Sequence, residues 1–188
     1  IADTAKVPLE SLSSQVLQVS GDMHIGANEI AEAAYQAISA GQDTGNAVVF
    51  AGQASMLATA GFTSSASAVD ILTTALNAYG KGADEAGHVS DVLLTTQNLP
   101  GLYRIRRNAD HFAIHHDMPV VDELAGSMGR VIPLAAAYNV SLENLSSGLA
   151  VMTANGIATA EASTYTKSML NELGDTGSNV GKILQQQT

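Results

Sequence analysis

The chain contains no cysteine, which excludes disulfides and metal sites built from thiolates. A cysteine-free chain fits a reducing compartment, and it also fits a virion or an extracellular setting. Tryptophan is absent too, and aromatic residues make up only 4% of the chain. Large aromatic rings usually anchor a hydrophobic core. The core of this protein therefore has to be built from aliphatic side chains and alanine.

Charged residues are scarce, at 14% of the chain, against about 25% in ordinary soluble domains. Eight Lys and Arg residues stand against 18 Asp and Glu, so the net charge is −10. This balance disfavours binding to nucleic acid and to anionic membrane surfaces. No window approaches the roughly 20 apolar residues of a membrane span, and the first residues lack the basic start and apolar run of a secretory signal. We expect no nucleic-acid partner and no membrane span.

Small residues dominate what is present. Across 8–97 and 120–188 the chain is Ala, Gly, Ser and Thr, interrupted by single Leu, Val, Ile and Met residues at helical spacing. Ala and Gly on facing stripes let helix axes approach more closely than the usual distance of about 8–10 Å. With 188 residues, of which 46% are hydrophobic, a real core is available. The pattern predicts an all-α fold, an array of about seven to eight antiparallel helices or helical hairpins.

Capping residues divide this helical pattern into segments. Ser64 or Ser65 is expected to cap one helix and Ser141 another, while Gly156 is expected to end the helix that Ser141 begins. Pro133 should kink or tighten the helix that opens near Asp122, because proline removes a backbone donor.

Residues 56–80 and 132–156 share a weak internal similarity, called here the internal echo. Both segments are expected to contain a helix, a break, a serine that caps the next helix, that helix, and a glycine that ends it. Two stacked hairpins of a repeat-like array would produce this echo. The alternative is that any two helical hairpins share this order of helix-capping and helix-ending residues.

One segment differs from the rest of the chain because it contains few small residues. From Leu99 to Pro119 the chain reads LPGLYRIRRNADHFAIHHDMP, which holds three of the eight basic residues and three of the five histidines. LYRIRR and HFAIHH alternate apolar and polar residues around a turn-like Asn-Ala-Asp, so we expect a small β-hairpin insert near 101–118.

His111, His115 and Asp117 are the candidate metal ligands in this segment. His111 and His115 share a face whether the segment is helical or extended, and two imidazoles with a carboxylate suit zinc or nickel. The competing interpretation is a solvated hairpin with incidental histidines, which we favour. We therefore expect neither a metal nor a cofactor. A His-based metalloenzyme would need bound metal and three convergent ligands.

Arg104, Arg106 and Arg107 form a local basic patch, and they are the candidate partner-binding residues. Arg104 and Arg106 fall on one face of the expected strand. Acidic helices are a simpler partner for this patch than nucleic acid, because the chain as a whole is acidic.

No catalytic motif is present: the chain has no P-loop, no HExxH, no GxSxG and no GxGxxG after a strand. Its acidic residues lie mostly at expected helix starts, where they complement the helix dipole. We expect a protein without enzymatic activity.

Several segments nevertheless carry a family resemblance. EIAEAAYQAISAGQD (29–43), FAGQASMLATAGF (50–62), SAVDILTTALNAYG (67–80) and SDVLLTTQNL (90–99) resemble the conserved core region of phage tail tape measure proteins. The stretch from 122 to 173, which includes GRVIPLAAAYNVSLENLSSGLAVMTANGIATAEASTYTKSMLNEL, resembles the same region. The resemblance covers nearly the whole chain apart from about 100–119.

This resemblance implies a structural protein of a phage or prophage tail. Such proteins are long and mostly helical, occupy the lumen of the tail tube, set tail length during assembly, and leave the tube at infection to help genome delivery. The implied location is the virion tail, and the bacterial cytoplasm during assembly. The implied partners are further copies of the chain, tail tube and tip proteins, and tail chaperones. No functional residue can be carried over one by one.

We expect three parts in this chain, namely residues 1–99 as the first half of the tape measure core, 100–119 as a basic, His-rich insert, and 120–188 as the second half. We also expect that the chain is a piece of something longer. The alternative function is a helical binding module that uses the 100–119 hairpin as its partner surface.

Overall fold

A computed structural model of the chain describes residues 7–61, 63–107, 121–175 and 177–185. Within these ranges the protein is all-α, as the sequence predicts, and no strand occurs. The helices are α1 (Leu9–Met23), α2 (Ala27–Ser39), α3 (Ala47–Ala60), α4 (Ser65–Ala78), a short 3-10 helix η1 (Ala83–Glu85), α5 (Ala86–Arg107), α6 (Val121–Met128), α7 (Ile132–Ala137), α8 (Leu142–Ala154), α9 (Thr159–Gly174) and α10 (Asn179–Gln185).

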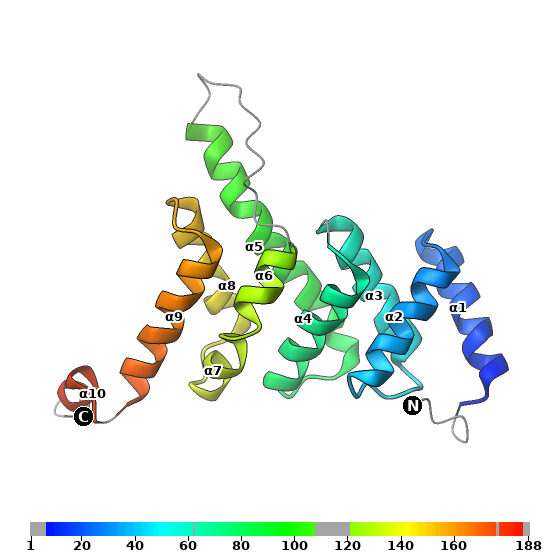
Figure 1. Cartoon of the computed structure of the whole chain (residues 1–188), viewed down its shortest axis with the longest axis horizontal. Helices are drawn as coiled ribbons and strands as arrows, with labels where there is room; N and C mark the ends of the chain where they lie inside the picture. Colours follow the sequence, from blue (N-terminus) through cyan, green and yellow to red (C-terminus); the bar gives the residue numbers. More distant parts are fainter. Residues whose placement is uncertain (1–6, 62, 108–120, 176, 186–188) are drawn as a thin grey trace.

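The helices form an elongated array of two layers. One layer contains α1, α3, α5 and α8, each packed against the next, and the other contains α2, α4, the α6–α7 pair and α9. Consecutive helices such as α2 and α3, or α8 and α9, fold back on each other across the layers. The array runs from α1 at one end to α9 and α10 at the other (Figure 1). Antiparallel helical hairpins are therefore its building unit.

The expected serine caps are confirmed. Ser64 Oγ accepts a hydrogen bond from the Ser67 amide at 3.1 Å at the start of α4, and Ser141 Oγ accepts one from the Asn144 amide at 3.2 Å at the start of α8. Each bond satisfies an amide that the first helical turn leaves without a partner. Gly156 follows α8 with a φ of 93°, a left-handed conformation that glycine adopts without strain.

Small side chains fill the core. Alanine is the most frequent buried hydrophobic residue in the described part of the chain, and Phe50 is the one aromatic ring buried there. Buried Ser90 and Thr166 bond to the carbonyls of Ala86 and Ala162 one turn earlier, each at 2.8 Å. These two buried hydroxyls are thus satisfied by the helices that carry them.

Helices approach closely where α1 crosses α3. A methyl group added at Gly52 would lie 2.7 Å from Met23 Sδ and 2.8 Å from Val19 Cγ1. Such distances are shorter than any ordinary van der Waals contact, so only glycine leaves α1 room at this crossing. The small residue here has the role that the sequence pattern predicts.

The expected β-hairpin near 101–118 is wrong for the part that the structure describes. Residues 101–107 continue α5 as a helix, while 108–118 lie outside the described residues. Leu and Arg are good helix formers, and extending an existing helix is much easier than nucleating a new element. A short apolar–polar alternation is too weak a signal to outweigh both.

The break near Pro133 is sharper than the sequence predicts. Instead of one kinked helix, α6 ends at Met128 and α7 begins at Ile132, with Pro133 in the first turn of α7. Proline is tolerated there because first-turn amides have no partner within the helix.

The internal echo has no counterpart as a repeat along the array. The α3–α4 connection passes from the first layer to the second, whereas the α7–α8 connection passes from the second layer to the first. The two hairpins are therefore not related by a step along the array. The internal echo is explained by the helix-capping and helix-ending residues that helical hairpins have in common.

Candidate interaction surfaces

The candidate metal ligands His111, His115 and Asp117 lie outside the described residues, so they stay a prediction. Across the described ranges, no group of three or more His, Asp or Glu residues is placed to hold a metal ion. Nor does any helix in those ranges combine the length and apolarity needed to cross a membrane.

The candidate partner-binding residues Arg104, Arg106 and Arg107 lie in the last turns of α5. The end of α5 extends beyond the neighbouring helices, away from the rest of the array (Figure 1). In a helix, positions 104 and 106 are about 200° apart, whereas 104 and 107 are neighbours. The expected shared strand face of Arg104 and Arg106 is therefore wrong, while a role in partner binding stays a prediction.

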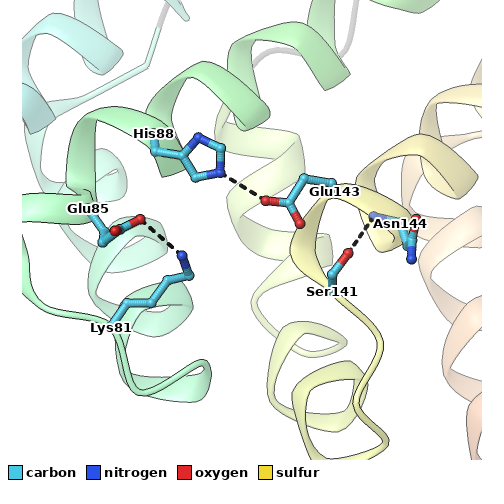
Figure 2. A network of polar contacts seen from close by, with 6 residues as sticks. All are labelled: Lys81, Glu85, His88, Ser141, Glu143 and Asn144. Atoms are coloured by element: carbon cyan, nitrogen blue, oxygen red, sulfur yellow. Dashed lines mark hydrogen bonds and ion pairs between the residues drawn. The ribbon is translucent and has the colours of Figure 1, made fainter.

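A polar bridge joins the first helices of the chain to the later ones. His88 Nε2, on α5, lies 2.9 Å from Glu143 Oε1, on α8, and both side chains are about half exposed (Figure 2). The hydrogen bond with His88 is the main cause that lowers the pKa of the Glu143 carboxyl. Glu143 also lies in the first turn of α8, where a carboxylate complements the helix dipole.

Tyr79 makes a second connection between the same parts. It follows α4, and its hydroxyl donates a hydrogen bond to the Val140 carbonyl at 2.9 Å, just before α8. Burial, and then the nearby charge of Glu143, raise the pKa of Tyr79 to about 12. Close to this connection, Lys81 and Glu85 form an exposed ion pair at 3.0 Å (Figure 2). Because the two residues are four apart, this pair supports only the local entry into α5.

One end of the array carries an open apolar groove of about 440 Å³ between α1 and α2, here called the N-terminal groove. Leu9, Leu17 and Tyr35 line it while remaining more than half exposed. No residue of α1, which the structure describes in full, is buried. Within the described part of the chain, α1 therefore presents apolar side chains to its surroundings.

The opposite end also exposes apolar side chains, here called the C-terminal face. Tyr165, Met169 and Leu173 are spaced by four along α9, so they form one stripe, and they are 51%, 54% and 45% exposed. Val180 and Ile183 of α10 add to this face.

Sequence patterns alone miss these surfaces for physical reasons. The partners His88 and Glu143 are 55 residues apart, and no local signal connects them. The apolar spacing of α1 and α9 correctly predicts helices, but it does not show which apolar stripe is covered by a neighbour.

Comparisons with known proteins give the family. A family model described as phage-related minor tail protein matches residues 13–103 and 120–187. A protein of Clostridium phage phiCD119, described as a probable tape measure protein, is 34% identical over 187 residues, which cover 97% of this chain and 18% of that relative. The chain thus spans about a fifth of the length of this curated relative, and no solved structure gives a significant match. The collinear match over nearly the whole chain shows that this protein belongs to the family of phage-related minor tail proteins.

Proposed function

We propose that this chain is the core region of a tape measure protein, which sets tail length during assembly and assists genome delivery. The observation that carries the proposal is the match to the phiCD119 relative, which is described as a probable tape measure protein and whose similarity spans 97% of the chain. An array of small-residue helices suits the role, because small-residue surfaces can pack in more than one arrangement.

In this proposal the chain acts as a scaffold and catalyses no reaction. The family of phage tail proteins supports a structural role. Its partners are further copies of the chain, tail tube and tip proteins, and tail chaperones. It is located in the virion tail, and in the bacterial cytoplasm while tails assemble.

We further propose that residues 1–99 and 120–188 are two halves of one core, with 100–119 as an insert between them. The family match supports this division, because it is interrupted between residues 103 and 120. The pairing of His88 with Glu143 (Figure 2) and of Tyr79 with Val140 joins the two halves. His88 lies near the start of α5, at the other end of that helix from its projecting end.

Deleting this segment in frame from the phage gene tests the proposal. If the chain is part of the length-setting core, electron microscopy of the lysates should show shortened tails or no tails at all. Tails of normal length and number would overturn the role. A deletion restricted to residues 108–119 is the matched control, and it should leave tail length nearly unchanged.

The projecting end of α5, with three arginine positions, supports a second candidate function, a binding module for acidic partners. Replacing Arg104, Arg106 and Arg107 with alanine separates the two functions. A scaffold should still assemble tails of normal length, whereas a module that depends on this surface should lose its function.

A further inference from the structure

We propose that Asn155 is a site of spontaneous deamidation, and that the C-cap of α8 controls how fast the reaction proceeds. Asn155 and Gly156 form the single Asn-Gly step of the sequence, and both residues are exposed to solvent. The inference goes beyond the proposed role in the phage tail and does not depend on it.

The reaction needs only these two residues and water. The backbone nitrogen of Gly156 attacks Asn155 Cγ, so a new N–C bond forms and the side-chain nitrogen leaves as ammonia. Water then opens the resulting five-membered imide at one of its two carbonyls, which gives aspartate or isoaspartate. Glycine is the most favourable residue to follow the asparagine, because it has no Cβ to hinder the attack. Every other asparagine of the chain precedes a residue with a side chain.

The backbone of the folded chain keeps the reacting atoms apart. Asn155 is the C-cap of α8, with a φ of −88° and a ψ of 8°. In the imide the Gly156 nitrogen belongs to one ring with Asn155 Cβ and Cγ, so it has to eclipse Cβ about the Cα–C bond. At a ψ of 8° it eclipses the Asn155 backbone nitrogen instead. The peptide between the two residues must therefore rotate before they react.

Two backbone hydrogen bonds oppose this rotation. The Gly156 amide donates to the Thr153 carbonyl at 3.0 Å, and the Ile157 amide donates to the Met152 carbonyl at 3.2 Å. Together with the left-handed φ of Gly156 they form a Schellman motif. The side chains of Ile157 and Met152 are partly buried against the hydrophobic core, so the motif is anchored to the rest of the array. We therefore expect the folded chain to react much more slowly than the unfolded chain.

The product is a poorer C-cap than the asparagine. Asn155 Nδ2 donates a hydrogen bond to the Val151 carbonyl at 2.8 Å, and a carboxylate has no proton to donate in its place. Its negative charge would also lie at the C-terminal end of α8, where the helix dipole disfavours anions. Isoaspartate lengthens the backbone by one atom and displaces the amides of the motif. Deamidation therefore weakens the α8–α9 connection.

Deamidation of the purified 188-residue chain, at mildly alkaline pH and with or without denaturing guanidinium chloride, tests the inference. Trypsin cleaves after Arg130 and Lys167, so a single peptide carries Asn139, Asn144 and Asn155, and its fragmentation in a mass spectrometer assigns the conversion to one residue. In denaturant Asn155 should convert several-fold faster than the other two, which are its matched controls. Its rate in native buffer should be at least about tenfold lower, which corresponds to a local opening free energy above about 1.4 kcal/mol.

Ile157→Ala tests the control by the C-cap. It removes most of the side chain that anchors the motif, so it should raise the native rate at Asn155 at least about threefold and leave the rate in denaturant unchanged. Ile38→Ala is the matched control, because Ile38 is also partly buried against the core but lies on α2. It should leave both rates unchanged. Circular dichroism establishes that both variants fold, and Ile157→Val and Ile38→Val replace them if they do not.

Asn155→Asp reproduces one product of the reaction. It should lower the Tm by about 1–4 °C, because of the charge at the end of α8. An unchanged or higher Tm would overturn the effect of the product on the fold. Equal conversion of Asn155, Asn139 and Asn144 in denaturant would overturn the site. Equal native and denatured rates at Asn155, or equal effects of Ile157→Ala and Ile38→Ala on its native rate, would overturn the control by the C-cap.

Discussion

Gly52 determines how closely α1 can approach α3. The side chains that limit this space are Met23, which is flexible, and Val19, which is branched at Cβ and held in one rotamer by its helix. Gly148, in the middle of α8, is exposed and has no neighbouring atom within 4 Å of an added methyl group. Comparing alanine substitutions at the two glycines therefore distinguishes the packing cost of an added methyl group from its gain in helix propensity.

We expect Gly52→Ala to lower the free energy of unfolding by about 1 kcal/mol, because overpacking costs roughly 1–3 kcal/mol and the gain in helix propensity offsets up to about 1 kcal/mol of it. Gly148→Ala should raise the free energy of unfolding by about 0.5–1 kcal/mol. Urea unfolding measures both. Stabilisation by Gly52→Ala equal to that of Gly148→Ala would show that α1 does not pack closely on α3.

Because of Tyr79, we expect the stability of the fold to depend on pH in the alkaline range. Its pKa is raised from 10.0 to about 12 in the folded protein, so the neutral phenol stabilises the fold below pH 10 and this contribution is lost as pH rises toward 12. We expect Tyr79→Phe to cost about 1 kcal/mol at neutral pH, because the Val140 carbonyl loses its partner. Unfolding measured between pH 7 and about pH 11 should show the difference between the two proteins shrinking. A constant difference would contradict the raised pKa.

At the scale of single helices, residues with a local physical signal could be predicted from the sequence. Ser64, Ser141 and Gly156 mark helix ends because each satisfies or accommodates the backbone at that point. Residues 101–107 could not be predicted in the same way, since their alternation fits a strand, whereas α5 simply continues through them. The sequence predicts that Pro133 disturbs a helix, and in the structure Pro133 lies in the first turn of a new one.

The cap at Ser141 provides a test at this scale. Ser141→Ala should lower the free energy of unfolding by about 1 kcal/mol, since the Asn144 amide loses its acceptor. Ser147→Ala, at an exposed site within the same helix, should change stability by no more than a few tenths of a kcal/mol in the stabilising direction. Thermal unfolding followed by circular dichroism compares them. Equal effects of the two substitutions would show that the cap contributes nothing.

At the scale of the whole molecule, the sequence predicts helices and close packing but not their order in space. Ala-rich faces resemble one another, so nothing in the apolar spacing of α3 shows that it lies between α1 and α5, or that α8 follows α5 in the same layer. The two apolar ends of the array follow from that order. They too could be recognised only once the structure placed α1–α2 and α9–α10 at opposite ends.

The central claim, that this chain is part of a length-setting core, is tested most directly by duplicating it within the phage gene and measuring tail length by electron microscopy. A copy of 188 residues should lengthen the tail by about 280 Å if it lies in the tube as continuous helix, at about 1.5 Å per residue, and by less if the two-layer array persists there. Assembled tails of unchanged length would contradict the claim.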